Sequence, residues 1–216
     1  MRLFQAQGVG VKICGITTES DAEMCISEGA NALGFNFFPG SKRYLNLQNN
    51  LDWIRNLNGK VDRVAVVVNA SAELLAALHE ADCFELIQFH GDESPKECEG
   101  YGFKKWIKAI RVKNVNSLKE AMAFSCSTLL FDAWSAAGYG GTGEAADWLM
   151  IRNFAEESPA RNIILAGGLK PDNVASAIRS VRPKAVDVAG GVEMKPGVKC
   201  SKLVRAFIHE ARHALI

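Results

Sequence analysis

The chain has 216 residues, of which 48% are hydrophobic, 23% charged and 8% aromatic, a composition typical of a folded globular protein and unlike that of a disordered chain. Its 25 basic and 24 acidic residues leave a formal net charge of +1, so it lacks the basic excess of proteins that bind nucleic acids. No segment approaches the ~20 consecutive apolar residues of a membrane-spanning helix. We therefore expect residues 1–216 to form a single domain whose partner is a small molecule rather than a nucleic acid or a membrane.

Eight short apolar or β-branched segments are predicted as strands, because turn-forming residues bound each of them. In chain order they are Gly10–Cys14, Ala32–Asn36, Arg63–Val68, Leu86–His90, Trp106–Arg111, Thr128–Asp132, Asn162–Ala166 and Ala185–Ala189. Apolar residues with helical spacing lie between them, as in Glu19–Glu28, Ala72–Ala81, Asn173–Ser180 and Ser201–Ala214. Ser71 is placed to cap the second of these helices, and Pro171 is placed to open the third.

Strands and helices alternate along the chain, which predicts parallel strands joined by right-handed crossovers. The strands are continuously apolar, as in Val64–Val68 and Ile163–Leu165, which indicates that both faces of the sheet are buried. Eight strand–helix units favour an α/β fold of the (β/α)8 TIM-barrel class. An open doubly wound sheet is the alternative, since periodicity does not show whether the sheet closes.

The cysteines are scattered and form no C-x-x-C pair; they are Cys14, Cys25, Cys83, Cys98, Cys126 and Cys200. Residues 1–11 contain neither a long apolar stretch nor the pattern of a signal-peptide cleavage site. We therefore expect reduced thiols in a cytoplasmic protein.

Polar residues or glycines follow the carboxyl end of every predicted strand. They are Cys14 with Gly15, Asn36, Asn69, His90 with Gly91, Arg111, Asp132, Gly167 with Gly168, and Gly190 with Gly191. In a parallel barrel these ends open onto one face, where active sites form. Turn formation explains Asn36 and Asn69, but it explains Cys14, His90 and Asp132 poorly.

Two glycine pairs, Gly167-Gly168 and Gly190-Gly191, follow the last two predicted strands, a place where barrels commonly bind phosphate. Glycine allows backbone N–H groups to approach an anion closely, and the helix start after Pro171 adds further donors. Tight turns would explain one such pair equally well, but two pairs at these positions favour a phosphate site.

Two further motifs match cofactor or metal patterns but lie in the wrong context. Gly138–Gly143 matches G-x-G-x-x-G, yet it follows the sixth strand, so we interpret it as a loop that closes over an anion rather than as a dinucleotide site. His209–His213 matches the zinc motif H-E-x-x-H, yet it lies on the last amphipathic helix, where we expect a solvated outer face. We therefore predict neither a metal nor a cofactor.

Many of these residues belong to short motifs that follow one another along most of the chain. The motifs are Lys12–Gly15, Ala32–Phe35, Ser41–Tyr44, Gln88–Gly91, Asp132, Tyr139–Gly143, Ala166–Leu169, Val186–Val188 and Gly191–Glu193. In order and spacing the set resembles the phosphoribosylanthranilate isomerases of tryptophan biosynthesis. The resemblance implies an eight-fold barrel that converts N-(5-phosphoribosyl)anthranilate to 1-(2-carboxyphenylamino)-1-deoxyribulose 5-phosphate without a cofactor. It also implies that Cys14 is the general base and Asp132 the general acid.

This Amadori rearrangement explains the residue types. The acid must protonate the ring oxygen of the sugar, so we expect desolvation or hydrogen bonding to keep Asp132 protonated. The base must remove a proton from the neighbouring carbon, although a free thiol of pKa ~8.5 is mostly protonated at pH 7. The site must therefore lower the pKa of Cys14 or accept a cost of roughly 2 kcal/mol. We expect Lys12 to point to the other side of its strand, so that Cys14 does not gain from this cation.

The resemblance also suggests the residues that bind substrate. Arg43 would hold the anthranilate carboxylate as a bidentate fork, and the phosphate would lie at Gly167, Gly168, Gly190 and Gly191. Gln88, His90 and Asp187 are candidates for substrate contacts, each with a structural role as the alternative. Gly141 belongs to the loop that is expected to close over the site.

The chain departs from the family pattern at two places. Ala189-Gly190 stands where family members commonly carry serine, which puts phosphate affinity rather than the chemistry in doubt. Met1–Gly8 precede the usual first strand and receive no function. Cys14 and Asp132 argue against the remaining alternatives, which are an aminoaldose isomerase of the histidine pathway, a ribulose-phosphate epimerase and a non-catalytic sugar-phosphate-binding barrel. The sequence is compatible with a monomer and with a homodimer.

Overall fold

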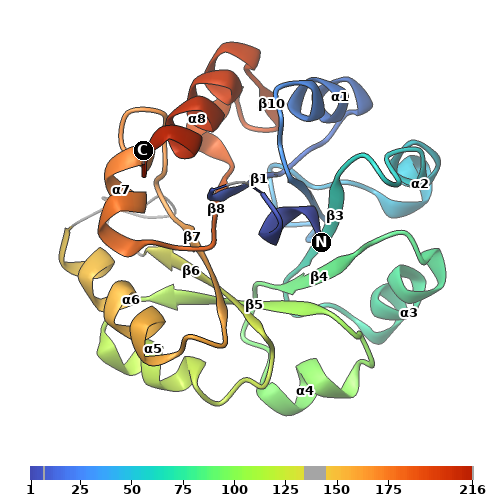
Figure 1. Cartoon of the computed structure of the whole chain (residues 1–216). Helices are drawn as coiled ribbons and strands as arrows, with labels where there is room; N and C mark the ends of the chain where they lie inside the picture. The colour runs from blue at the N-terminus through green and yellow to red at the C-terminus, as the bar shows by residue number, and fades with distance from the viewer. Residues whose placement is uncertain (7, 134–144, 216) are drawn as a thin grey trace.

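The computed structural model describes residues 1–6, 8–133 and 145–215. Eight strands form a closed barrel in the order of the sequence, and all their pairings are parallel (Figure 1). The strands are β1 Gly10–Cys14, β2 Ala32–Asn36, β3 Asp62–Val67, β4 Leu86–Phe89, β5 Trp106–Val112, β6 Thr128–Ala133, β7 Asn162–Ala166 and β8 Ala185–Val188. The predicted (β/α)8 barrel is confirmed, and the alternative of an open sheet is wrong because β1 pairs with β8.

Helices surround the barrel on its outside (Figure 1). They are α1 Glu19–Ser27, α2 Leu47–Arg55, α3 Ala72–Ala81, α4 Pro95–Gly100, α5 Val115–Ala121, α6 Ala145–Glu157, α7 Val174–Val181 and α8 Ser201–His213. Two 3-10 turns, η1 Arg2–Phe4 and η2 Gly190–Val192, and a short hairpin of β9 Glu193–Lys195 with β10 Val198–Lys199 are additional. No helix among the described residues is long and apolar enough to cross a membrane.

Side chains just before a helix determine where the helix begins. Ser71 caps α3 as predicted, since its hydroxyl accepts a hydrogen bond from the N–H of Leu74 at 3.3 Å. Pro171 does not open α7, which begins only at Val174. The side chain of Asn173 instead holds the preceding turn, accepting from the N–H of Lys170 at 2.8 Å and donating to the carbonyl of Gly168 at 3.0 Å.

Alternate residues of the strands enter two apolar clusters. The cluster inside the barrel contains Ala32, Val64, Val66, Leu86, Ile107, Ala109, Leu130, Ile164, Ala166 and Ala185. The cluster between the strands and the surrounding helices includes Val11, Ile13, Leu33 and Phe35. Because successive side chains of a strand point to opposite faces, membership in the first cluster identifies the residues that face the barrel interior.

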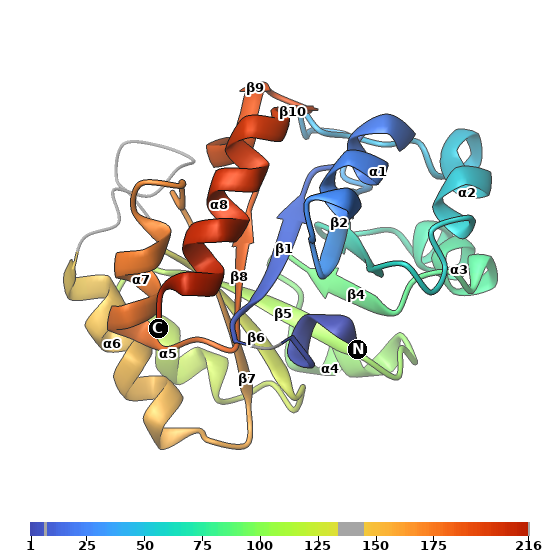
Figure 2. The ribbon, with the colours of Figure 1, turned by 45° about the horizontal axis from the view of Figure 1, so that its top comes forward.

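The N-terminal segment closes the amino end of the barrel. η1 lies across that opening in Figure 1, and Figure 2 shows it at the end opposite the β9–β10 hairpin. Leu3 is fully buried in the cluster inside the barrel, and its N–H donates to Asp62 Oδ2 at 2.9 Å. A side chain at Gly10 would overlap the carbonyl of Leu3. The turn around Leu3, in a segment with no function predicted from the sequence, thus has a structural role.

Replacing Leu3 by alanine is expected to lower the free energy of unfolding by about 2–5 kcal/mol, because it leaves a cavity in the interior cluster. Denaturant titration measures this change. Leu149→Ala is the matched control, since Leu149 is 59% exposed and its loss should change stability by less than about 0.5 kcal/mol. Equal effects of the two substitutions would show that η1 does not stabilise the barrel.

Candidate active site

Cys14 is the last residue of β1 and Asp132 the last but one of β6, and both face the barrel interior. Cys14 is partly exposed and packs against the cluster inside the barrel. Asp132 lies two residues beyond Leu130, a member of that cluster, so alternation turns its carboxyl group inward as well. Its side chain is 36% exposed. Because the carboxyl ends of the strands open onto one face of a barrel, the two side chains share one mouth.

Lys12 also faces the barrel interior, so the expectation that it points away from Cys14 is wrong. Residues two apart on a strand share a face, and Lys12 is fully buried there. Its Nζ donates to Asp187 Oδ1 at 2.8 Å, across the pairing of β1 with β8, and its positive charge acts on the pKa of Cys14. In this structure Asp187, a candidate for substrate contact, holds a lysine beside the cysteine.

Gly34, on the neighbouring strand β2, leaves room for this pair. A Cβ atom at this position would lie 2.8 Å from Cys14 Sγ and 3.0 Å from Lys12 Nζ. Both are closer than ordinary van der Waals contact, so a larger residue would displace the thiol or the ammonium group. Gly34 belongs to the motif Ala32–Phe35, but nothing in the sequence shows that it lies against Cys14.

Burial raises the pKa of Cys14 above its ordinary value near 9, because a thiolate is poorly solvated inside a protein. Lys12 and Lys199 act in the opposite direction, whereas the carboxylate of Asp187 adds to the rise. The thiol is therefore the dominant form at neutral pH. Of the two possibilities for this cysteine, a lowered pKa or an energetic cost, the site has the second.

The thiolate fraction of Cys14 is expected to rise about tenfold per pH unit between pH 7 and 9, because its pKa lies at or above the top of this range. Alkylation by iodoacetamide, followed by mass spectrometry of the peptide that contains Cys14, measures this fraction. Lys12→Gln should slow alkylation at each pH, since it removes a cation, and Asp187→Asn should accelerate it, since it removes an anion. A rate that levels off below pH 8, or two variants that shift in the same direction, would contradict this electrostatic account.

His90 lies between Asp132 and Gln88. Its Nε2 is 3.6 Å from Asp132 Oδ2, within ion-pair range but too far for a hydrogen bond. Its Nδ1 is 2.8 Å from the amide nitrogen of the fully buried Gln88. The amide of Gln88 thus orients the ring of His90, and Nε2 is the ring atom that faces Asp132. The structure thus brings all three predicted side chains together, with Gln88 behind His90.

Arg43, in the loop after β2, already holds a carboxylate in a fork. Its Nε donates to Glu193 Oε1 at 2.8 Å and its Nη2 to Glu193 Oε2 at 2.6 Å. A side chain at Gly15 would overlap the Arg43 stem, and a Cβ at Gly190 would lie 3.3 Å from Arg43 Nη2. Arg43 therefore extends from the end of β1 to the second glycine pair. Its partner Glu193 was not among the predicted site residues.

The two glycine pairs lie side by side. Gly167 and Gly168 have φ angles of +89° and +60°, which L side chains rarely adopt. A side chain at Gly191 would overlap the carbonyl of Leu169, so the turn after β7 touches the turn after β8. Two adjacent turns of this kind can direct N–H groups toward one anion, as the sequence analysis predicted for phosphate.

The sequence patterns also singled out Gly141 and the motif His209–His213. Gly141, with the rest of Gly138–Gly143, falls outside the described residues. The side chains of His209, Glu210 and His213 are exposed on α8, and no group of three or more possible metal ligands occurs in residues 1–6, 8–133 and 145–215.

Comparisons with family models and with known sequences all match this chain to the same enzyme family. Residues 11–210 match the family model described as N-(5'phosphoribosyl)anthranilate (PRA) isomerase. The N-(5'-phosphoribosyl)anthranilate isomerase of Citrifermentans bemidjiense is 44% identical over 202 residues, which cover 94% of this chain and 96% of that protein. The enzyme of the same name from Pseudomonas fluorescens strain Pf0-1 is also 44% identical, over 93% of this chain and 97% of its own length.

Solved structures of the same family also resemble this chain. The phosphoribosyl anthranilate isomerase of Thermotoga maritima superposes with a TM-score of 0.86 at 37% identity, over 94% of this chain and 98% of that chain. A second structure, of a phosphoribosyl anthranilate isomerase in complex with reduced 1-(o-carboxyphenylamino)-1-deoxyribulose 5-phosphate, has a TM-score of 0.81 at 35% identity, with the same coverage of 94% and 98%.

Proposed function

The chain belongs to the N-(5'-phosphoribosyl)anthranilate isomerase family, the isomerases of tryptophan biosynthesis, and from this premise we propose that it converts N-(5-phosphoribosyl)anthranilate to 1-(2-carboxyphenylamino)-1-deoxyribulose 5-phosphate. In this proposal Asp132 is the general acid and Cys14 the general base. The observation that supports it most is the placement of a carboxyl group and a thiol on β6 and β1, facing one barrel mouth from different sides.

The reaction begins when Asp132 protonates the ring oxygen of the ribose. The bond from this oxygen to C1 breaks, and the anilino nitrogen donates its lone pair to form an iminium ion. His90 supports this step from its position beside Asp132, since its Nε2–H can interact with the carboxylate that remains after the proton has left. That the site keeps Asp132 protonated beforehand stays a prediction.

The Cys14 thiolate then removes the proton from C2 of the opened sugar, and the electrons of the C–H bond neutralise the iminium to give an enolamine. Lys12, held by Asp187 at 2.8 Å, stabilises the thiolate that carries out this step. Tautomerisation moves a proton from the C2 hydroxyl to C1 and gives the ketone. The proton that Cys14 gains balances the one that Asp132 gives up, and exchange with solvent returns both groups to their starting states. No electron passes to a second molecule, so the steps require no redox cofactor.

The remaining predicted residues bind the two anionic ends of the substrate. Arg43 would face the anthranilate carboxylate, and the phosphate would lie at the turns Gly167-Gly168 and Gly190-Gly191, whose contact is described above. Gly141 would complete the site from the loop after β6. Gln88 and Asp187 would act through the side chains that they hold, His90 and Lys12.

The test is turnover of phosphoribosylanthranilate generated enzymatically in the cuvette, followed by the loss of its fluorescence. The protein should accelerate this loss well beyond the spontaneous rate, and an excess of chelator should leave the rate unchanged. Loss no faster than in a protein-free control would refute the proposed function. Inhibition by the chelator would instead direct attention to His209 and His213.

A further inference from the structure

The carboxylate of Glu193 is buried between two cations at the edge of the candidate site. Its side chain is only 3% exposed. Besides the fork from Arg43, its Oε1 accepts a hydrogen bond from Lys199 Nζ at 2.7 Å. Burial alone would raise the pKa of Glu193, but the hydrogen bonds from Arg43 and Lys199 hold it below its ordinary value. The group is therefore a carboxylate at neutral pH.

Lys199 connects this carboxylate to two strand ends. Its fully buried Nζ also donates to the carbonyl of Cys14 at 2.6 Å and to that of Ala189 at 3.3 Å. The first carbonyl belongs to the residue proposed as the base, and the second directly precedes the Gly190 turn. Glu193 is thus linked to three parts of the site, which are the end of β1, the loop that carries Arg43 and the turn proposed to bind phosphate.

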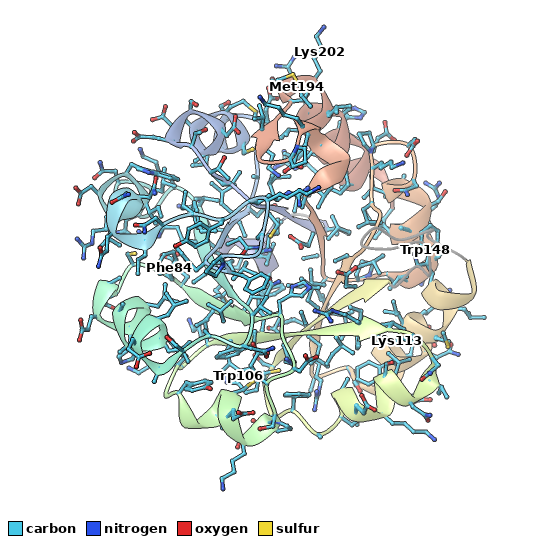
Figure 3. All side chains as sticks on the ribbon, turned by 180° about the vertical axis from the view of Figure 1, so that it is seen from behind. Phe84, Trp106, Lys113, Trp148, Met194 and Lys202 are labelled. Carbon is cyan, nitrogen blue, oxygen red and sulfur yellow. The ribbon has the colours of Figure 1, made fainter. Side chains whose placement is uncertain are left out.

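The β9–β10 hairpin supplies both Glu193 and Lys199. Figure 2 shows this hairpin beyond the carboxyl ends of β1 and β8. Along β9 the side chains alternate, so that Glu193 faces the barrel while Met194 is 70% exposed, and Figure 3 shows Met194 at the outer edge of the molecule near Lys202. The hairpin therefore turns one carboxylate, Glu193, and one ammonium group, Lys199, inward while Met194 and Lys195 stay exposed.

The fork with Glu193 occupies one edge of the Arg43 guanidinium, formed by Nε and Nη2. Among the described residues no side chain or carbonyl accepts a hydrogen bond from Nη1, which leaves the second edge of the planar group available. A planar group held along one edge presents the other in a fixed direction. In addition, one carboxylate between two cations leaves a single positive charge, which favours an anionic ligand.

We propose that Glu193 is a positioning residue that fixes Arg43, so that the enzyme selects substrates whose aromatic ring carries a carboxylate. This inference rests on the proposed function and extends it to specificity. Holding Arg43 in advance removes the loss of rotamer freedom from the act of binding. Without Glu193 the arginine would lose its direction. Lys199 would keep its own hydrogen bonds to the carbonyls of Cys14 and Ala189, so the contacts of the sugar and the phosphate would stay the same.

The test compares two ligands with and without the aromatic carboxylate. They are reduced 1-(2-carboxyphenylamino)-1-deoxyribulose 5-phosphate and the corresponding reduced phenylamino compound, each titrated by calorimetry. Glu193→Gln should weaken binding of the first by about tenfold to a hundredfold, as expected for lost hydrogen bonds to charged groups, and should leave binding of the second nearly unchanged. With phosphoribosylanthranilate, KM should rise by a larger factor than kcat falls.

Two further variants provide a matched control and a conservative substitution for this experiment. Glu28→Gln is the matched control, because Glu28 accepts a similar fork from Arg205, at 2.9 Å and 2.8 Å, on the outside of the barrel; neither ligand should respond to it. Glu193→Asp keeps the charge but shortens the side chain, so it should reproduce the selective loss even if Glu193→Gln does not fold.

Equal losses for both ligands, or no loss for either, would overturn the proposal, since a purely structural role would not distinguish them. Failure of the proposed function has a different signature. In that case the unmodified protein would neither accelerate the isomerisation nor bind the carboxylated ligand, whereas failure of this inference alone would leave both intact.

Discussion

Cys14→Ala is expected to lower kcat by about 10²- to 10⁴-fold, the range by which a positioned general base accelerates proton transfer. An alanine cannot take the proton from C2, and two charged groups that act on Cys14, Lys12 and Asp187, are engaged with each other at 2.8 Å. Single-turnover loss of substrate fluorescence measures the effect. Binding of the reduced product analogue should stay close to that of the unmodified protein, because alanine removes only one atom from the mouth.

Cys200→Ala is the matched control for this experiment, since Cys200 is also partly exposed but precedes α8. It should retain full activity. Substantial turnover by Cys14→Ala would remove the thiol from the mechanism. A parallel loss of analogue affinity would show that the substitution had disturbed the site rather than the proton transfer.

Asp132→Asn is expected to reduce kcat by a similar factor of about 10²- to 10⁴-fold, because an amide cannot deliver a proton to the ring oxygen. Asparagine has nearly the shape of aspartate, so the contact with His90, 3.6 Å away in this structure, should change little. Ligand affinity should be retained, and the loss should appear in the single-turnover rate as well as in the steady state.

The exposed Asp92, on the loop after β4, provides the comparison for Asp132. Asp92→Asn changes the net charge by the same amount and should have almost no effect on kcat. If the two variants were equally active, the general acid would have to be sought elsewhere. If both variants lost kcat equally, a change in the electrostatic potential at the barrel mouth would explain the loss better than a missing general acid.

The sequence predicted the barrel well because local signals and global topology agree. β1, β2 and β7 have the predicted boundaries, and the other strands differ by one residue at their ends, since apolar runs end where turn-forming residues begin. The start of α7 differs from the prediction because Asn173, and not Pro171, holds the turn that precedes the helix. η1 was missed because three residues carry no periodic pattern.

The site was predicted residue by residue but not in its pairings. Lys12 and Asp187 are separated by 175 positions, and Arg43 and Glu193 by 150, so only closure of the barrel brings either pair together. The misplacement of Lys12 was avoidable, because the two-residue period of a strand puts it on the same face as Cys14. The proximity of His90 to Asp132 depends on the curvature of the sheet, which sequence patterns do not encode.

The ion pair formed by Lys12 and Asp187 has a consequence for how this protein could evolve. Exchanging a desolvated pair of charges for well-packed apolar side chains is often neutral or favourable for folding, whereas Cys14 depends on the ammonium group beside it. Under the proposed role of Cys14 as general base, selection for heat resistance alone would therefore tend to replace both charges and yield a more stable barrel that no longer isomerises. Their persistence in a lineage would record selection for catalysis in opposition to selection for durability.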